Sequence, residues 1–198
     1  MSATGFLRPA DITPAVQVLF DEDVADPGYV MNVSRLWANQ PEEMISLLSL
    51  AKQMSLPGEL SKRERTVLLA AALSALGDSY CTLVWGSRLA LASDADTAAG
   101  VIRGNDEGLD ANEQALARWA RRVARDPSAI SEQDVQALRD AGYDDSRIFA
   151  ITAFVGLRLA FAIINGALGV LPDADLRKSA PGPVLDAVTF GRSIEPAS

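Results

Sequence analysis

Residues 60–93 read LSKRERTVLLAAALSALGDSYCTLVWGSRLALAS, and this stretch decides the fold. Apolar residues within 67–76 recur at the i, i+3/i+4 spacing of one helix face. Ser61 is followed three residues later by Glu64, and this capping-box pattern predicts where the helix begins. Gly77 predicts where it ends, because glycine adopts a positive φ without steric cost. The stretch therefore predicts two helices that meet at this glycine.

Cys81 is the only cysteine in the chain, and it lies just inside the second of these helices. Asp78 or Ser79 can cap the start of that helix. If Asp78 is the cap, Cys81 falls in the first turn, where free N–H groups and the helix dipole favour a thiolate. The carboxylate of Asp78 acts in the opposite direction and raises the pKa of a nearby thiol. Cys81 is therefore a candidate reactive thiol, with a small buried packing residue as the alternative.

The sequences LSKRER and ALGDSYCTLVWGSRLA resemble the core of the AhpD-like, carboxymuconolactone decarboxylase superfamily. The layout resembles most the longer peroxidase-related (alkylhydroperoxidase-like) members. The resemblance implies an all-α helical fold and a homo-oligomer, either a dimer or a trimer of dimers. Peroxidase members carry a Glu on the first helix, then Cys-x-x-Cys, then a His four residues after the second Cys.

Transferred to this sequence, the second cysteine of that motif falls on Cys81 and the first on Asp78. The His position is occupied by Trp85 and the Glu position by Thr66. The relay is thus reduced to Cys81, and the resemblance implies a one-cysteine, peroxide-related antioxidant enzyme that needs an external thiol reductant. The alternative is a non-redox protein of the same fold, either a lyase or a small-molecule-binding pseudoenzyme whose pocket these four positions line.

The rest of the chain also reads as helices, and no strand alternation is evident. Similar helical hairpins are expected at 61–92 and 131–168, packed together as two lobes. The expected domain spans residues 1–172, with a candidate lobe boundary near 103–109. Residues 173–198 are expected to form a tail that packs on the body or on a partner, or stays mobile.

The apolar helix expected at 147–168 carries Arg158 near its middle. It is long enough to span a bilayer, but a central arginine costs roughly 2.5–3.5 kcal/mol on insertion scales. A buried core or interface helix is therefore expected, and no membrane partner. A buried Arg158 needs a carboxylate, for which Asp78 and Glu64 are candidates, or a subunit boundary. Tyr80 and Arg158 are further candidates for the pocket, where the arginine could bind an anionic group.

Composition excludes several classes of function. The 198 residues carry a formal net charge of −8 and no histidine. The acidic balance disfavours nucleic acid as a partner, and the lack of histidine excludes Ser-His-Asp and Cys-His catalysis. A single cysteine excludes an intrachain disulfide and a cysteine-based zinc site, so we expect no metal and no cofactor. No secretory signal is evident at the N-terminus, and a cytoplasmic location is expected.

Overall fold

The computed structural model describes residues 5–196, and over this range it contains α-helices and one short 3-10 turn but no strand. The predicted all-α class is confirmed. The helices are α1 (Pro14–Ala25), α2 (Asn32–Trp37), α3 (Pro41–Ser55), α4 (Lys62–Leu76), α5 (Ser79–Ala92), α6 (Ala95–Arg103), α7 (Ala111–Arg125), α8 (Glu132–Asp140), α9 (Asp145–Ala167), α10 (Leu176–Ser179) and α11 (Gly182–Ala187), with the 3-10 turn at Pro127–Ala129.

Helix α4 begins at the predicted capping box. The Ser61 hydroxyl accepts a hydrogen bond from the Glu64 backbone N–H at 3.1 Å, and the Glu64 carboxylate accepts one from the Ser61 N–H at 2.7 Å. Residues 67–73 then lie almost fully buried, with no more than 1% of any residue exposed. Helix α4 packs against α5, α6, α7 and α9, so it is the centre of the molecule.

The turn between α4 and α5 also follows the sequence. Gly77 adopts a left-handed conformation with φ of 81°, which ends α4. The Asp78 carboxylate accepts a hydrogen bond from the Cys81 backbone N–H at 2.9 Å, which caps α5. Cys81 is therefore the third residue of α5, in the first turn.

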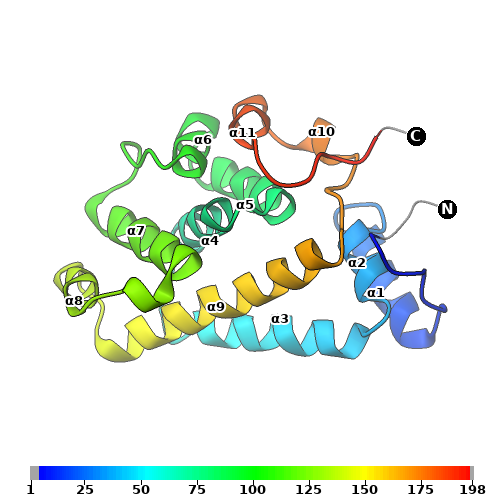
Figure 1. Ribbon diagram of the computed structural model, residues 1–198, viewed down its shortest axis with the longest axis horizontal. Helices are drawn as coiled ribbons and strands as arrows, with labels where there is room; N and C mark the ends of the chain where they lie inside the picture. The colour runs from blue at the N-terminus through cyan, green and yellow to red at the C-terminus, as the bar shows by residue number, and fades with distance from the viewer. Residues whose placement is uncertain (1–4, 197–198) are drawn as a thin grey trace.

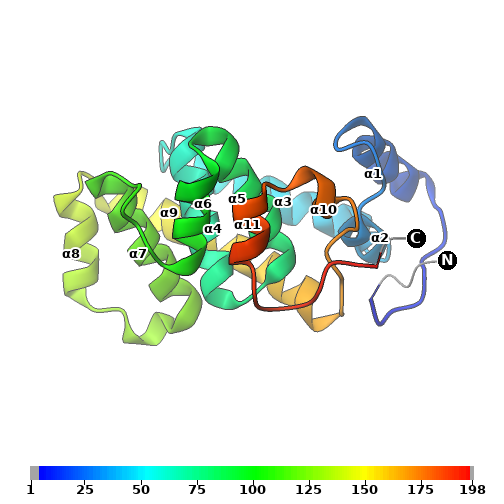
Figure 2. The ribbon, with the colours of Figure 1, turned by 90° about the horizontal axis from the view of Figure 1, so that it is seen from above.

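The remaining helices surround this central pair. Helices α3 and α9 run side by side along one flank, and α6 and α11 cover the opposite flank (Figure 1). Seen from above, α7 and α8 form one end of the molecule, while α1 and α2 lie at the other (Figure 2). The two predicted hairpins correspond to α4–α5 and α8–α9, and the relation between them stays a prediction.

Partly buried ion pairs hold α7 to α4 and to the loop that precedes α7. The Arg63 guanidinium donates to both carboxylate oxygens of Glu113, at 2.5 and 3.1 Å, which joins α4 to α7. The Arg121 guanidinium binds the Asp106 carboxylate in the same two-pronged way, at 2.7 Å for each bond. Paired guanidinium–carboxylate contacts of this kind fix orientation as well as adding stability.

Residues 173–196 of the expected tail pack on the body. The buried Asp173 carboxylate accepts from the Tyr80 hydroxyl at 2.6 Å and from the Asn32 backbone N–H at 2.7 Å. Further along, the Ser79 hydroxyl donates to the Arg192 carbonyl at 2.7 Å. The outer ends of the expected segments, at residues 1–4 and 197–198, lie outside the described residues.

Helix α9 is long and apolar enough to cross a membrane by length and composition alone. Half of its most apolar window is buried inside the protein, where it packs against α3, α4 and α7. The helix is therefore a core element on one side, as expected from Arg158 within it.

We predict that Ser61→Ala lowers the free energy of unfolding by about 1 kcal/mol, because it removes the capping hydrogen bond of the central helix. Chemical denaturation followed by circular dichroism measures the change. Ser49→Ala is the matched control, since Ser49 is an exposed residue within α3 and caps nothing. Equal stability of the two variants would contradict the role given to the cap.

Candidate functional site

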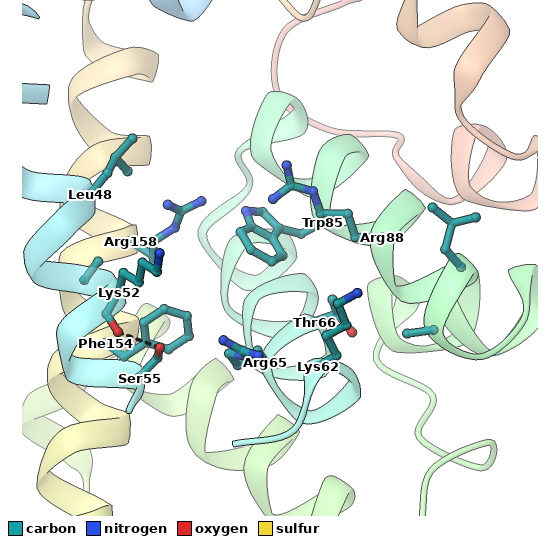
Figure 3. A pocket seen from close by; sticks show the side chains of 13 residues that line it. Leu48, Lys52, Ser55, Lys62, Arg65, Thr66, Trp85, Arg88, Phe154 and Arg158 are labelled. Carbon is teal, nitrogen blue, oxygen red and sulfur yellow. Dashed lines mark hydrogen bonds between the residues drawn. The ribbon is translucent and has the colours of Figure 1, made fainter. Parts of the chain in front are cut away.

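A cavity of about 520 Å³ opens between α3, α4, α5 and α9. Figure 3 shows α3 and α9 forming one wall and α4 and α5 the other, with long basic side chains reaching into the space between them. The lining residues are Leu48, Ala51, Lys52, Ser55, Lys62, Arg65, Thr66, Trp85, Arg88, Leu91, Ala92, Phe154 and Arg158.

The charge of this lining is of one sign. Its five ionisable side chains are all cationic and come from four helices: Lys52, Lys62, Arg65, Arg88 and Arg158. No aspartate or glutamate lines the cavity, and none of the five forms an ion pair with any residue in the described range. The surrounding protein is acidic overall, so the cavity is a local concentration of positive charge.

Trp85 lies at the centre of this arrangement. The Arg88 guanidinium lies 4.6 Å from the centre of the indole ring and the Arg158 guanidinium 4.9 Å from it. Arg158 also lies 5.7 Å from the ring centre of Phe161. Cations are attracted to the faces of aromatic rings, most strongly when they are shielded from water.

The expected ion pair of Arg158 with Asp78 or Glu64 was wrong. Glu64 instead accepts hydrogen bonds from the Ser61 N–H and from the Tyr143 hydroxyl, the latter at 2.9 Å. The aromatic rings take the place of a carboxylate beside Arg158. Burial lowers the pKa of its guanidinium, but an arginine stays charged in proteins. Its charge is therefore left without a counter-ion.

Cys81 does not line the cavity and is 7% exposed. Burial raises the pKa of its thiol well above the ordinary value, and the neighbouring Asp78 carboxylate raises it further. Arg158 acts in the opposite direction, but its effect on the thiol pKa is smaller. The net shift in the pKa of the Cys81 thiol is therefore upward, and its two largest causes are burial and the Asp78 carboxylate.

The structure separates the other predicted site residues into two groups. Thr66, Trp85 and Arg158 line the cationic cavity. Asp78 borders a different hollow, of about 290 Å³, formed with α9 and residues 191–192. The Tyr80 hydroxyl points to Asp173 and lines neither space. The expectation of one pocket lined by all four relay positions is therefore not met.

Four of the five cations of the cavity were not predicted from the sequence: Lys52, Lys62, Arg65 and Arg88. Two weak signals point to three of them, Lys62, Arg65 and Arg88. Lys62 and Arg65 are three residues apart, as are Trp85 and Arg88, so each pair shares a helix face. Nothing in the sequence shows that these faces, on α4 and α5, meet across one space.

The cavity lining offers groups that can bind an anion. The hydroxyl of Thr66 donates to the Arg63 carbonyl of its own helix at 2.7 Å. No carboxylate or histidine lines the cavity to exchange protons near neutral pH. Among residues 5–196, no group of three His, Cys, Asp or Glu side chains is placed to hold a metal ion. The arrangement suits an anion that interacts with the guanidinium and ammonium groups.

We predict that Cys81 in the folded protein reacts with iodoacetamide far more slowly than free cysteine at pH 7–8. A raised pKa keeps the thiol protonated, so the rate should increase only above the ordinary thiol pKa of about 8.5. Intact mass measured against time and pH follows the reaction. Protein unfolded in guanidinium, which should react at the normal rate, is the control.

Asp78→Asn tests the cause of the raised pKa. Asparagine keeps a capping oxygen but removes the charge, so the alkylation rate should increase slightly while burial, the larger cause, remains. Alkylation of the folded wild type at the rate of free cysteine at pH 7 would contradict this description of Cys81.

Comparison with known proteins shows which fold this geometry belongs to. No protein-family model matches the sequence, and no curated protein matches it either. Solved structures do match. A peroxidase-related protein from Silicibacter sp. superposes with a TM-score of 0.76 at 22% identity, covering 88% of this chain and 95% of the other.

Two further solved structures superpose on this chain over most of its length. A peroxidase-related protein from Ralstonia eutropha, described as an alkylhydroperoxidase AhpD core, has a TM-score of 0.73 at 20% identity and covers 89% of this chain and 96% of the other. The debrominase Bmp8 has a TM-score of 0.72 at 15% identity and covers 95% of this chain and 98% of its own. The all-helical chain therefore has the AhpD-like fold, as its resemblance to that superfamily predicted.

Proposed function

We propose that this protein is a non-redox member of the AhpD-like fold that binds a small organic anion in the cavity between α3, α4, α5 and α9. The observation that carries the proposal is the set of five cations that line one space without a carboxylate. Like charges held this close repel one another, and a bound anion relieves the repulsion. Binding of an anion is therefore favoured by the resting charge of the cavity itself.

The lining also indicates the form of the ligand. Arg65, Arg88 and Arg158 offer planar guanidinium groups, which bind carboxylate or phosphate through paired hydrogen bonds. Trp85 and Phe154 offer aromatic surface on opposite walls, as Figure 3 shows. A ligand with an anionic group and a flat apolar body satisfies both kinds of surface.

A solved structure of the same fold supports the aromatic part of this proposal. A cysteine-to-alanine variant of the debrominase Bmp8 was crystallised with 2,3,4-tribromopyrrole, a small flat aromatic molecule. That structure matches this chain at 16% identity with a TM-score of 0.70. An AhpD-like fold can thus hold a ligand of this size.

The one-cysteine peroxidase, the other activity inferred from the resemblance, has less support. A thiol peroxidase needs an accessible thiolate, and an external reductant must reach the oxidised sulfur. The Cys81 side chain is buried, does not line the cationic cavity and has a raised pKa. A lyase would need an acid–base pair in the cavity, and its lining offers no carboxylate and no histidine.

Isothermal titration calorimetry with phenyl phosphate, benzoate and benzyl alcohol tests the proposal. These probes share an aromatic ring and differ in charge. We expect both anions to bind, the phosphate more tightly, and the alcohol not to bind measurably. The dissociation constant should increase with salt concentration, because ions screen the attraction at the partly open cavity.

Arg158→Gln and Arg88→Gln should each raise the dissociation constant for phenyl phosphate roughly ten- to a hundredfold. This estimate corresponds to the loss of a charge-assisted hydrogen bond worth about 1.5–3 kcal/mol. Lys178→Gln is the matched control, since Lys178 is an exposed cation on α10 that does not line the cavity. Absence of binding by both anions, or equal weakening by the control, would refute the proposal.

A further inference from the structure

The polar side chains of the cationic cavity are almost all hydrogen-bond donors. The five cations of its lining donate and cannot accept, and the indole N–H of Trp85 also only donates. The two remaining polar side chains of the lining are the hydroxyls of Ser55 and Thr66. Among the side chains of the cavity, these two oxygens are therefore the only acceptors that a ligand can use.

The protons of both hydroxyls are already committed. The Ser55 hydroxyl donates to the Lys52 carbonyl at 2.7 Å, and the Thr66 hydroxyl donates to the Arg63 carbonyl at 2.7 Å. A carbonyl oxygen cannot donate, so the hydroxyl is the donor in each pair. A hydroxyl oxygen also has two lone pairs, and neither oxygen accepts a hydrogen bond from any residue between 5 and 196. What Ser55 and Thr66 offer to a ligand is therefore acceptance of its proton.

These two acceptors lie deeper than the cations beside them. Ser55 is 4% exposed and Thr66 is 6% exposed, whereas Lys52 and Lys62 are exposed. Figure 3 shows Ser55 on the α3 wall and Thr66 on the opposite α4 wall. Ser55 follows Lys52 by three residues and Thr66 follows Lys62 by four, which is about 4.5 and 6 Å along the helix axis. Each wall thus has an acceptor inside and a cation about one helical turn nearer the mouth.

A buried acceptor distinguishes between ligands that differ in a single group. In the empty cavity, water can donate to these oxygens. A ligand with a methyl group at this place displaces the water and leaves the acceptor unpaired, which costs free energy. A ligand with a hydroxyl or amino group there restores the hydrogen bond. Sites built to hydrogen-bond a substrate group reject the analogue that lacks it in this way.

We propose that the ligand of this cavity is an aromatic acid with an uncharged donor, a hydroxyl or an amino group, at the end opposite its anionic group. The anionic group lies among the cations, and the donor is accepted by Ser55 and Thr66. This inference rests on the proposed anion binding and adds the second group that the ligand carries. It makes Ser55 and Thr66 determinants of specificity rather than of charge attraction.

Isothermal titration calorimetry with benzoates that differ only at one ring position tests the inference in the wild type. The donor probes are 4-hydroxybenzoate and 4-aminobenzoate, and 4-methylbenzoate and 4-methoxybenzoate have no donor there. We expect each donor probe to bind roughly three- to tenfold more tightly, the effect of one neutral hydrogen bond. The isomer 2-hydroxybenzoate should bind like the methyl compound, because its hydroxyl donates to its own carboxylate.

The double variant Ser55→Ala with Thr66→Val should remove this preference. The dissociation constant of 4-hydroxybenzoate should increase to that of 4-methylbenzoate, whose own value should stay within about twofold, since no charge has changed. The ratio of the two constants is the readout, and a purely structural loss would weaken both probes alike. Circular dichroism confirms that the variant is folded.

Ser87→Ala is the matched control. The Ser87 hydroxyl also donates to a carbonyl of its own helix, that of Leu83 at 2.7 Å, but Ser87 does not line the cavity. Hydroxyls on helices commonly form this bond for local reasons alone. The control variant should therefore keep the full preference for the donor probes.

The outcomes separate this inference from the proposed function. Equal binding of all the benzoates by the wild type would overturn the inference and leave anion binding intact. A preference that survives in the double variant, or that Ser87→Ala also removes, would overturn the role of Ser55 and Thr66. Absence of binding by every benzoate and by phenyl phosphate would overturn both the inference and the proposed function.

Discussion

Everything in this fold depends on a helix that is buried on every side. Residues 67–73 of α4 are at most 1% exposed, and four other helices pack around them. A helix with apolar residues all round is stable only when neighbours cover it completely. The three alanines at 70–72 are small enough for those neighbours to approach closely. The outer helices are thereby set at fixed positions, and the cavity walls on α4 and α5 are fixed with them.

The same packing explains why the pKa of the Cys81 thiol is raised. Helix α5 starts directly after α4, so its first turn lies against the core and Cys81 is buried with it. The Asp78 carboxylate that caps α5 also places a negative charge beside the thiol. One residue therefore caps the helix and raises the pKa of the neighbouring thiol. The cavity itself is lined by basic side chains and not by this sulfur.

The helices and their ends could be predicted from the sequence, because the causes are local. Ser61, Gly77 and Asp78 each act on backbone groups within three or four residues, and each was found in its expected role. The cavity could not be predicted in the same way, because its cations come from four helices that meet only in the folded chain. Arg158 shows this limit: it is partly buried, as the sequence predicted, but its partner is an aromatic ring rather than a carboxylate.

The cationic cavity lies in an acidic molecule. This contrast affects which size of anion the proposed site favours. More than a quarter of the 18 lysines and arginines face this one space, while the whole chain carries a net charge of −8. At physiological ionic strength a charge is felt over only about 8 Å, so an anion senses the cavity chiefly when it reaches its mouth. A small anion can enter completely and leave the acidic exterior behind. A long polyanion would keep most of its charge over that exterior, so the proposed site favours short anions over extended ones.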